Sequence, residues 1–193
     1  LFVAYGSGLL AQDEMQAVEH PLLGSLREAL LAEGKPARTE ESRGPTPILV
    51  SGVERRCVLE TAPNIDEGRP YGLYGQRFAA ASEDAVKKAV RALEPPTFTN
   101  LLAMAAPQGG RGPYRADEIE GILLTAYTGF RAAVIESERL WAKAVEVEIR
   151  TGFWGCGAFG GNRALMVLLQ IIAARLAQVD QLRVYVFDEE GRK

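Results

Sequence analysis

The sequence predicts an α/β domain built in three layers. The main observation is that short apolar runs, typical of strands, alternate with patterns typical of helices. A second observation is a glycine-rich segment at residues 151–162, which joins one apolar run to a long helical pattern. The chain has 193 residues, 47% of them hydrophobic, which is enough to bury the core of one domain. The alternation argues against an all-α bundle and a β-sandwich.

The N-terminal part is predicted to contain strands and helices in turn. In chain order we expect a strand at residues 1–5, a turn at 6–8, a helix at 9–19, a helix at 25–33, a loop at 35–47, a strand at 48–52 and a loop at 61–77. Pro21 ends the first helix, because proline cannot continue one. Ser25 and Glu28 have the spacing of a capping box, and Gly34 closes the second helix. The strand at 48–52 has no alternation, which predicts that it is buried.

The C-terminal part continues the pattern. We expect a helix at residues 82–92, a flexible connection at 108–113, a helix at 116–126, a strand at 145–149, a helix at 163–179 and a strand at 182–187. The helix at 116–126 has an acidic first turn, which the helix dipole favours. His20, the single histidine, stands at a predicted helix end, where it is either a cation beside the helix C-terminus or a solvent-exposed ring.

Composition excludes several functions. The formal net charge is −3, which argues against direct DNA binding and against binding to anionic membranes. The longest apolar run, residues 164–174, is interrupted by Gln170 and is too short to span a bilayer. Cys57 and Cys156 form neither a disulfide framework nor, with one histidine, a metal site. We therefore expect no metal, no cofactor, no signal peptide, and a cytoplasmic or nuclear protein.

The glycine-rich segment reads Thr-Gly-Phe-Trp-Gly-Cys-Gly-Ala-Phe-Gly-Gly-Asn. Glycine runs cost backbone entropy and are tolerated where a backbone must come close to another group. The first N–H groups of the following helix lack intrahelical partners, so that the junction suits an anion such as a diphosphate. The spacing is neither the dinucleotide fingerprint nor a P-loop. The alternative is a tight turn whose aromatic residues, Trp154 and Phe159, fill the core.

Residues 151–161 resemble the diphosphate-binding segment of poly(ADP-ribose) glycohydrolases, Thr-Gly-Asn-Trp-Gly-Cys-Gly-Ala-Phe-Gly-Gly. The similarity continues through residues 168–170 into residues 184–188, and residues 126–130 resemble the Ala-Tyr-Cys-Gly-Phe that precedes this segment in the family. The resemblance implies a macrodomain-like three-layer α/β/α fold with a mixed sheet. It implies a single domain over residues 1–193. Whether strands or site residues stand upstream of Leu1 stays open.

The resemblance also implies which residues bind substrate. The backbone amides that would hold the diphosphate of ADP-ribose belong to Gly155, Cys156, Gly157, Ala158, Phe159, Gly160 and Gly161. Residues 71–78 resemble the family's Tyr-Thr-Gly-Tyr-Ala-Glu-Thr-Tyr, which makes Tyr74 the tyrosine that closes over the ligand. The alternative for Tyr74 is a loop tyrosine that packs on the surface.

A catalytic motif, Gln-Glu-Glu, is expected near the start of a member of this family, and the chain has Gln12, Asp13 and Glu14 there. Glu14 corresponds to the catalytic acid. Asp13 is one methylene shorter than the family's glutamate and retains an acceptor for a ribose hydroxyl, and Gln12 joins the substrate-binding residues. Taken alone, the three residues are an ordinary polar first turn of a helix.

Two departures from the family pattern keep the function open. The family has three consecutive glycines before Gln-Glu-Glu. A gapless match places residues 2–4 there, whereas a shortened loop would use residues 6–8. Phe153 replaces an asparagine. The resemblance thus implies hydrolysis of poly(ADP-ribose) on modified proteins, with two alternatives: a non-catalytic ADP-ribose reader, or a hydrolase of mono-ADP-ribosylated proteins.

Overall fold

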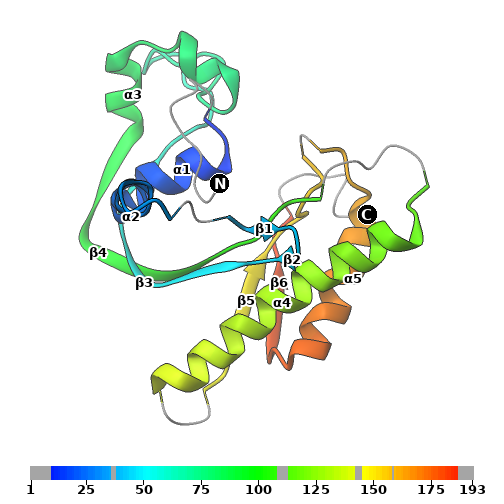
Figure 1. Ribbon diagram of the computed structural model, residues 1–193. Coiled ribbons are helices and arrows are strands. Elements are labelled where there is room, and N and C mark those ends of the chain that lie inside the picture. Colours follow the sequence, from blue (N-terminus) through cyan, green and yellow to red (C-terminus); the bar gives the residue numbers. More distant parts are fainter. Residues whose placement is uncertain (1–9, 36–37, 108–112, 142–144, 158, 187–193) are drawn as a thin grey trace. The chain divides into compact units, whose positions relative to one another are not determined.

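The computed structural model describes residues 10–35, 38–107, 113–141, 145–157 and 159–186 (Figure 1). The described residues divide into two compact units. Residues 10–35 and 50–101 form the N-terminal unit, and residues 38–49 and 102–186 form the C-terminal unit. The strand and turn predicted over residues 1–8 lie outside the described residues, as does most of the connection predicted at 108–113.

The N-terminal unit combines helices with a long two-stranded sheet. Its elements are α1 (Gln12–Glu19), α2 (Pro21–Ala32), most of β3 (Ile48–Leu59), a short 3-10 helix (Gln76–Ala80), α3 (Glu83–Ala89) and most of β4 (Val90–Ala103). Strands β3 and β4 pair with each other. The buried side chains of one core cluster in this unit come from the segment before α1, from β3, from the loop after it and from α3; they are Leu10, Leu59, Leu73 and Ala89.

The start of α2 differs from the prediction, and its end agrees with it. Helix α2 begins at Pro21, so that Ser25 lies inside the helix and is not its cap. Proline suits the first helical position because the N–H that it lacks would have no intrahelical acceptor there. Gly34 closes the helix as expected, with φ at +66°. The N–H of Lys35 donates to the carbonyl of Leu30 at 2.8 Å, which completes the turn that ends many helices.

The long strands also differ from the prediction. Strand β3 begins at Ile48, which confirms the predicted strand, but it continues to Leu59. Ser51 and Gly52 are exposed, so the predicted burial of residues 48–52 is wrong. An apolar run implies burial on both faces only inside a covered sheet, and β3 belongs to a two-stranded one. Strand β4 has no counterpart in the prediction. It contains Pro95 and Pro96, which strands accept at sheet edges, and both strands of a pair are edges.

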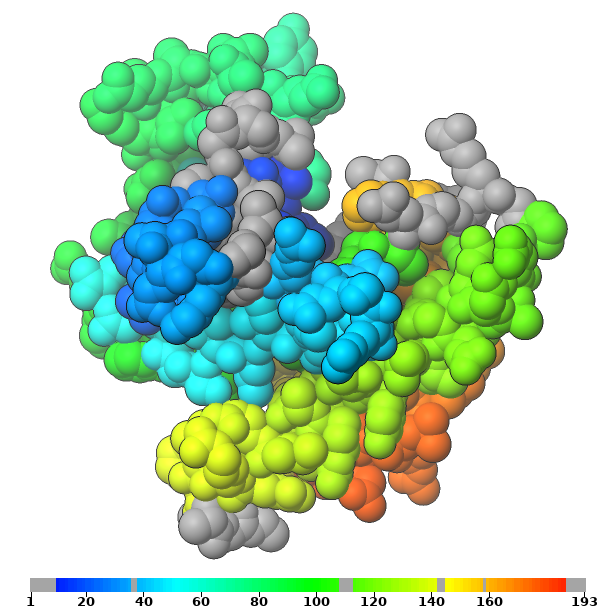
Figure 2. All heavy atoms as spheres, viewed as in Figure 1, coloured from blue at the N-terminus to red at the C-terminus, as the bar shows by residue number. Residues whose placement is uncertain are grey.

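The C-terminal unit is built on two helices that lie side by side (Figure 1). Its elements are β1 (Glu40–Glu41), β2 (Gly44–Pro45), α4 (Ala116–Trp141), β5 (Glu148–Thr151), α5 (Arg163–Ala177) and β6 (Gln181–Val184). Strands β5 and β6 run parallel, with Thr151 opposite Val184. Helix α4 continues for 15 residues beyond the predicted end at residue 126 and lies at the surface of the unit (Figure 2).

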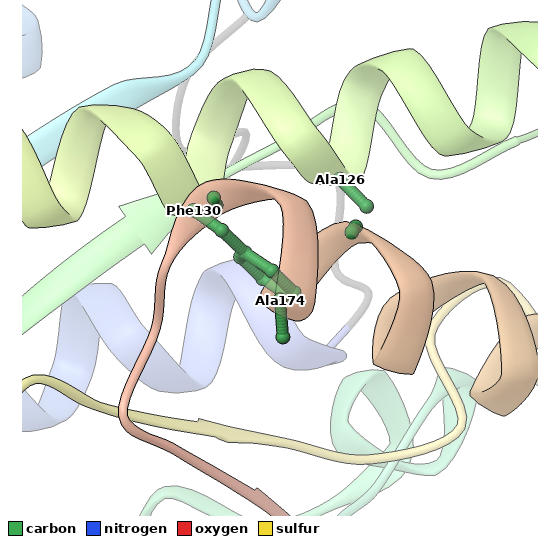
Figure 3. Close-up of a cluster of buried hydrophobic side chains, with 5 residues drawn as sticks. Ala126, Phe130 and Ala174 are labelled. Atoms are coloured by element: carbon green, nitrogen blue, oxygen red, sulfur yellow. The ribbon is translucent and has the colours of Figure 1, made fainter.

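In the core between α4 and α5, one large aromatic ring packs against small side chains. Phe130 of α4 is buried among Ala126 and three alanines of α5 (Figure 3). Alanine side chains allow the backbone of α5 to approach the ring closely, and such packing is sensitive to single methyl groups. This core holds α5 in place. The glycine-rich segment ends at Asn162, where α5 begins.

The mixed α/β class is confirmed. The strands within the described ranges form three two-stranded sheets, so no large mixed sheet occurs in that part of the chain. Among the helices that can be described, none has the length and apolar character needed to cross a membrane.

Candidate functional site

The glycine-rich segment connects β5 to α5, as the sequence predicts. Strand β5 ends at Thr151, and α5 begins at Arg163. Asn162 caps the helix, because its side-chain oxygen accepts the N–H of Leu165 at 3.0 Å. The N–H of Asn162 itself donates to the hydroxyl of Tyr114 at 2.8 Å. The segment therefore enters α5 in a defined geometry.

Two glycines allow the segment to fold back on itself. The N–H of Gly161 donates to the carbonyl oxygen of Gly155 at 3.0 Å. A Cβ on Gly161 would stand 2.7 Å from that same oxygen. Gly155 has φ at +74°, and a Cβ there would lie 3.0 Å from Pro107. The close approach of the two backbones thus requires glycine at both positions.

The backbone N–H groups of residues 155–161, which the sequence predicts to hold a diphosphate, fall into two sets. One set donates to carbonyls inside the segment and consists of Cys156, Gly160 and Gly161. The other set donates no hydrogen bond to any described residue and consists of Gly155, Gly157 and Phe159. Of the amides that the sequence predicts to hold an anion, only those of the second set have no acceptor among the described residues. Ala158 lies outside the described residues.

The aromatic residues of the segment divide between core and surface. Trp154 packs against the buried clusters of α4 and α5, so it fills the core as in the alternative interpretation. Phe159 is 45% exposed and offers a flat apolar surface. The ring of Phe153, which replaces the family's asparagine, lies 4.9 Å from the guanidinium of Arg163, within the range of a cation–π interaction.

The thiol of Cys156 is not set up as a nucleophile. Burial raises its pKa, and the nearby charge of Arg163 only partly opposes this effect. A raised pKa keeps the group in its thiol form at neutral pH, whereas nucleophilic attack needs the thiolate. Cys156 therefore contributes its backbone geometry and packing.

Glu14 is a buried carboxylate at the N-terminus of α1. It is the third residue of the helix and 9% exposed, whereas Gln12 and Asp13 are exposed. Its Oε2 accepts the N–H of Ala11 at 2.9 Å, which is half of a capping box. Its Oε1 has no hydrogen-bond partner among the described residues. The arrangement holds the carboxyl group in place by one oxygen and leaves the other available.

Tyr74 lies on a loop that is attached to the segment before α1. The N–H of Leu10 donates to the carbonyl of Gly75 at 3.1 Å, and the N–H of Gly75 donates back at 2.6 Å. Tyr74 is 54% exposed beside this pair. The structure thus ties the Tyr74 loop to the start of the helix that carries Gln12, Asp13 and Glu14. The amides of the glycine-rich segment belong to the other unit.

A second buried carboxylate, Glu19, was not singled out by the sequence. One of its oxygens accepts the N–H of Leu59 at 3.0 Å, and the other lies 2.7 Å from the guanidinium of Arg55. Both oxygens have partners, which indicates a structural role.

His20, the residue after Glu19, is 3% exposed, so the predicted solvent-exposed ring is wrong. His20 stands between the end of α1 at Glu19 and the start of α2 at Pro21.

We expect the stability of the protein to depend on pH through His20. Burial lowers its pKa from the ordinary 6.5, although the hydrogen bond to Gln16 and the charge of Glu19 oppose the shift. The unfolded chain then binds the proton more readily than the folded chain does. The stability contributed by the neutral, buried ring of His20 is therefore fully present above about pH 6.5, and it is lost as the pH falls toward the lower pKa of the folded state. Chemical unfolding measured between about pH 5 and 8 should show this loss in the wild type and a smaller one in His20→Gln. An equal pH dependence in both proteins would contradict the assignment.

The comparison with known families decides the class of protein. A family model described as Poly (ADP-ribose) glycohydrolase (PARG), Macro domain fold, matches residues 68–193. The chain belongs to this family. The match covers more than half of the chain and includes Tyr74 and the glycine-rich segment, whereas Gln12, Asp13 and Glu14 precede it. Membership indicates a glycohydrolase that acts on poly(ADP-ribose). In the described part of the chain, no group of three or more histidine, cysteine or acidic side chains could hold a metal ion.

Proposed function

We propose that the protein hydrolyses the ribose–ribose glycosidic bond of poly(ADP-ribose) and releases ADP-ribose, with Glu14 as the general acid/base. Residues 152–161 hold the diphosphate. The observation that carries the proposal is that the N–H groups of Gly155, Gly157 and Phe159 donate to none of the described residues. These groups lie in a glycine-rich turn between a strand and a helix, within the part of the chain matched by the family. The fold that goes with this proposal is one macrodomain-like α/β/α domain over residues 1–193.

The segment supplies binding through its backbone. A diphosphate carries negative charge, and the N–H groups of Gly155, Gly157 and Phe159 donate to it beside the positive end of the α5 dipole. The exposed ring of Phe159 packs on the ribose or adenine. Binding energy gained at the diphosphate, away from the bond that breaks, orients the ribose for reaction.

Glu14 supplies the proton transfer. Cleavage of a glycosidic bond passes through an oxocarbenium-like state, and a carboxylic acid must protonate the leaving oxygen. The carboxylate that results then accepts a proton from the attacking water. The hydrogen bond from Ala11 fixes Oε2, and Oε1 is the atom that carries the proton. Asp13 and Gln12, both exposed, contact the ribose, and Tyr74 closes over the bound ligand.

A reader function is the second candidate. Asp13 is shorter than the family's glutamate, and Phe153 interacts with Arg163 where the family has an asparagine. Both changes are consistent with a site that retains ADP-ribose binding and loses turnover. A third candidate removes single ADP-ribose units from proteins with the same binding residues.

The test is a release assay with two substrates. One acceptor protein carries poly(ADP-ribose) and a second carries single ADP-ribose units, and mass spectrometry identifies the released product. We expect free ADP-ribose from the polymer. Release from the second substrate alone would favour the mono-ADP-ribose hydrolase. Binding of ADP-ribose without release from either would favour the reader.

A further inference from the structure

Gln170 is a fully buried polar residue in the middle of α5. Its exposed fraction is 0%, and its neighbours on the helix are apolar. Burial of a primary amide costs free energy unless its donors and acceptors find partners. A glutamine at such a position therefore needs an explanation other than packing.

The amide of Gln170 binds the two residues at which β5 becomes the glycine-rich segment. Its Oε1 accepts the hydroxyl of Thr151 at 2.7 Å. Its Nε2 donates to the carbonyl of Gly152 at 3.2 Å and to the carbonyl of Met166, one turn earlier on α5, at 3.2 Å. Three of the four hydrogen bonds available to a glutamine are thus made, and two of the three go to the start of the segment.

These contacts fix the direction in which the segment leaves the strand. The carbonyl of Thr151 accepts the N–H of Tyr185 at 2.8 Å, so its backbone is already held by the chain that follows β6. With its side chain also bonded to Gln170, Thr151 is held from two sides. The far end of the segment is held separately, by the bond between Asn162 and the hydroxyl of Tyr114.

We propose that Gln170 is a positioning residue for the ligand, which acts through Thr151 and Gly152 to aim the unengaged N–H groups of the segment at the diphosphate. The inference rests on the proposed function, because it assumes that these N–H groups bind the diphosphate. Gln170 itself does not touch the ligand. Its removal therefore weakens ADP-ribose binding without affecting the proton transfer by Glu14.

The main test compares Gln170→Met with the wild type. Methionine has a similar length and fills the buried site, but it makes none of the three hydrogen bonds. We expect the affinity for ADP-ribose, measured by calorimetry, to fall by about tenfold or more. The control is Val134→Ala, a buried truncation on α4, which should lower the thermal midpoint and leave the affinity unchanged. An affinity loss no larger than that of Val134→Ala would overturn the inference.

Thr151 provides the test that a merely structural role would not pass. Thr151→Val removes the hydroxyl at nearly constant volume, and Thr151→Ser keeps it. We expect Thr151→Val to weaken binding and Thr151→Ser to bind as the wild type does. If the two residues act as a unit, the double variant Gln170→Met/Thr151→Val should bind about as well as the weaker single variant. Additive losses would show that they act independently and would overturn the inference.

A fluorescence measurement separates failure of this inference from failure of the proposed function. The chain has two tryptophans, Trp154 in the segment and Trp141 at the exposed end of α4. In a Trp141→Phe background, emission reports on Trp154 alone, and Gln170→Met should change it without any ligand. Unchanged emission together with unchanged affinity would overturn this inference only. Absence of ADP-ribose binding by the wild type would overturn the proposed function and the positioning role that depends on it.

Discussion

Replacement of Glu14 by glutamine is expected to abolish the release of ADP-ribose and to leave the affinity for ADP-ribose unchanged. The amide oxygen of glutamine still accepts the N–H of Ala11, so the start of α1 keeps its hydrogen bond. An amide cannot deliver a proton to the leaving oxygen, however, and loss of general acid catalysis costs about 10²- to 10⁴-fold in rate.

Separate assays of turnover and of binding make this result specific. Under the proposed function, calorimetry reports on binding of ADP-ribose by the glycine-rich segment and the residues around the ribose, whereas the release assay also requires the proton transfer by Glu14. The matched control is Glu28→Gln on the exposed face of α2, which should release ADP-ribose at the wild-type rate. Retained turnover in Glu14→Gln would remove Glu14 from the mechanism.

Replacement of Gly161 by alanine is expected to lower both stability and ADP-ribose affinity. The new Cβ would stand 2.7 Å from the carbonyl oxygen of Gly155. This oxygen belongs to the backbone and accepts the N–H of Gly161, so it cannot move aside as a flexible side chain could. The clash must therefore open the turn. Overpacking of this kind costs about 1–3 kcal/mol. Under the proposed function, an opened turn also displaces the N–H groups that bind the diphosphate.

Gly157→Ala is the matched comparison within the same segment. A Cβ on Gly157 meets no atom of the described residues within 4 Å, and Gly157 is exposed, so the free energy of unfolding should stay near the wild-type value. Denaturant unfolding of both variants tests this difference, and calorimetry tests the affinity of Gly161→Ala. If Gly161→Ala were as stable and bound ADP-ribose as well as the wild type, the close approach of the two glycines would have no functional importance.

Features encoded within a few residues were predictable. The glycine-rich turn, the beginning of α5 and the closure of α2 at Gly34 follow from backbone freedom and from the unpaired groups of helix ends. The order of strands and helices after residue 145 was predictable for the same reason. The predictions were wrong where contacts with neighbouring elements determine the local structure. Strand β4 contains two prolines that are acceptable only because the sheet has two strands.

In the candidate site, too, local features were predictable and features that depend on distant residues were not. The type of segment at residues 151–161 and the polar triplet at residues 12–14 could be recognised without a structure, since both are patterns of adjacent residues. Three further features depend on the folded chain: Glu14 is the buried carboxylate of the triplet, His20 is buried, and Gln170 accepts a hydrogen bond from Thr151. Burial and hydrogen-bond partners depend on residues far apart in the chain that folding brings together, and no local pattern of residues contains that information.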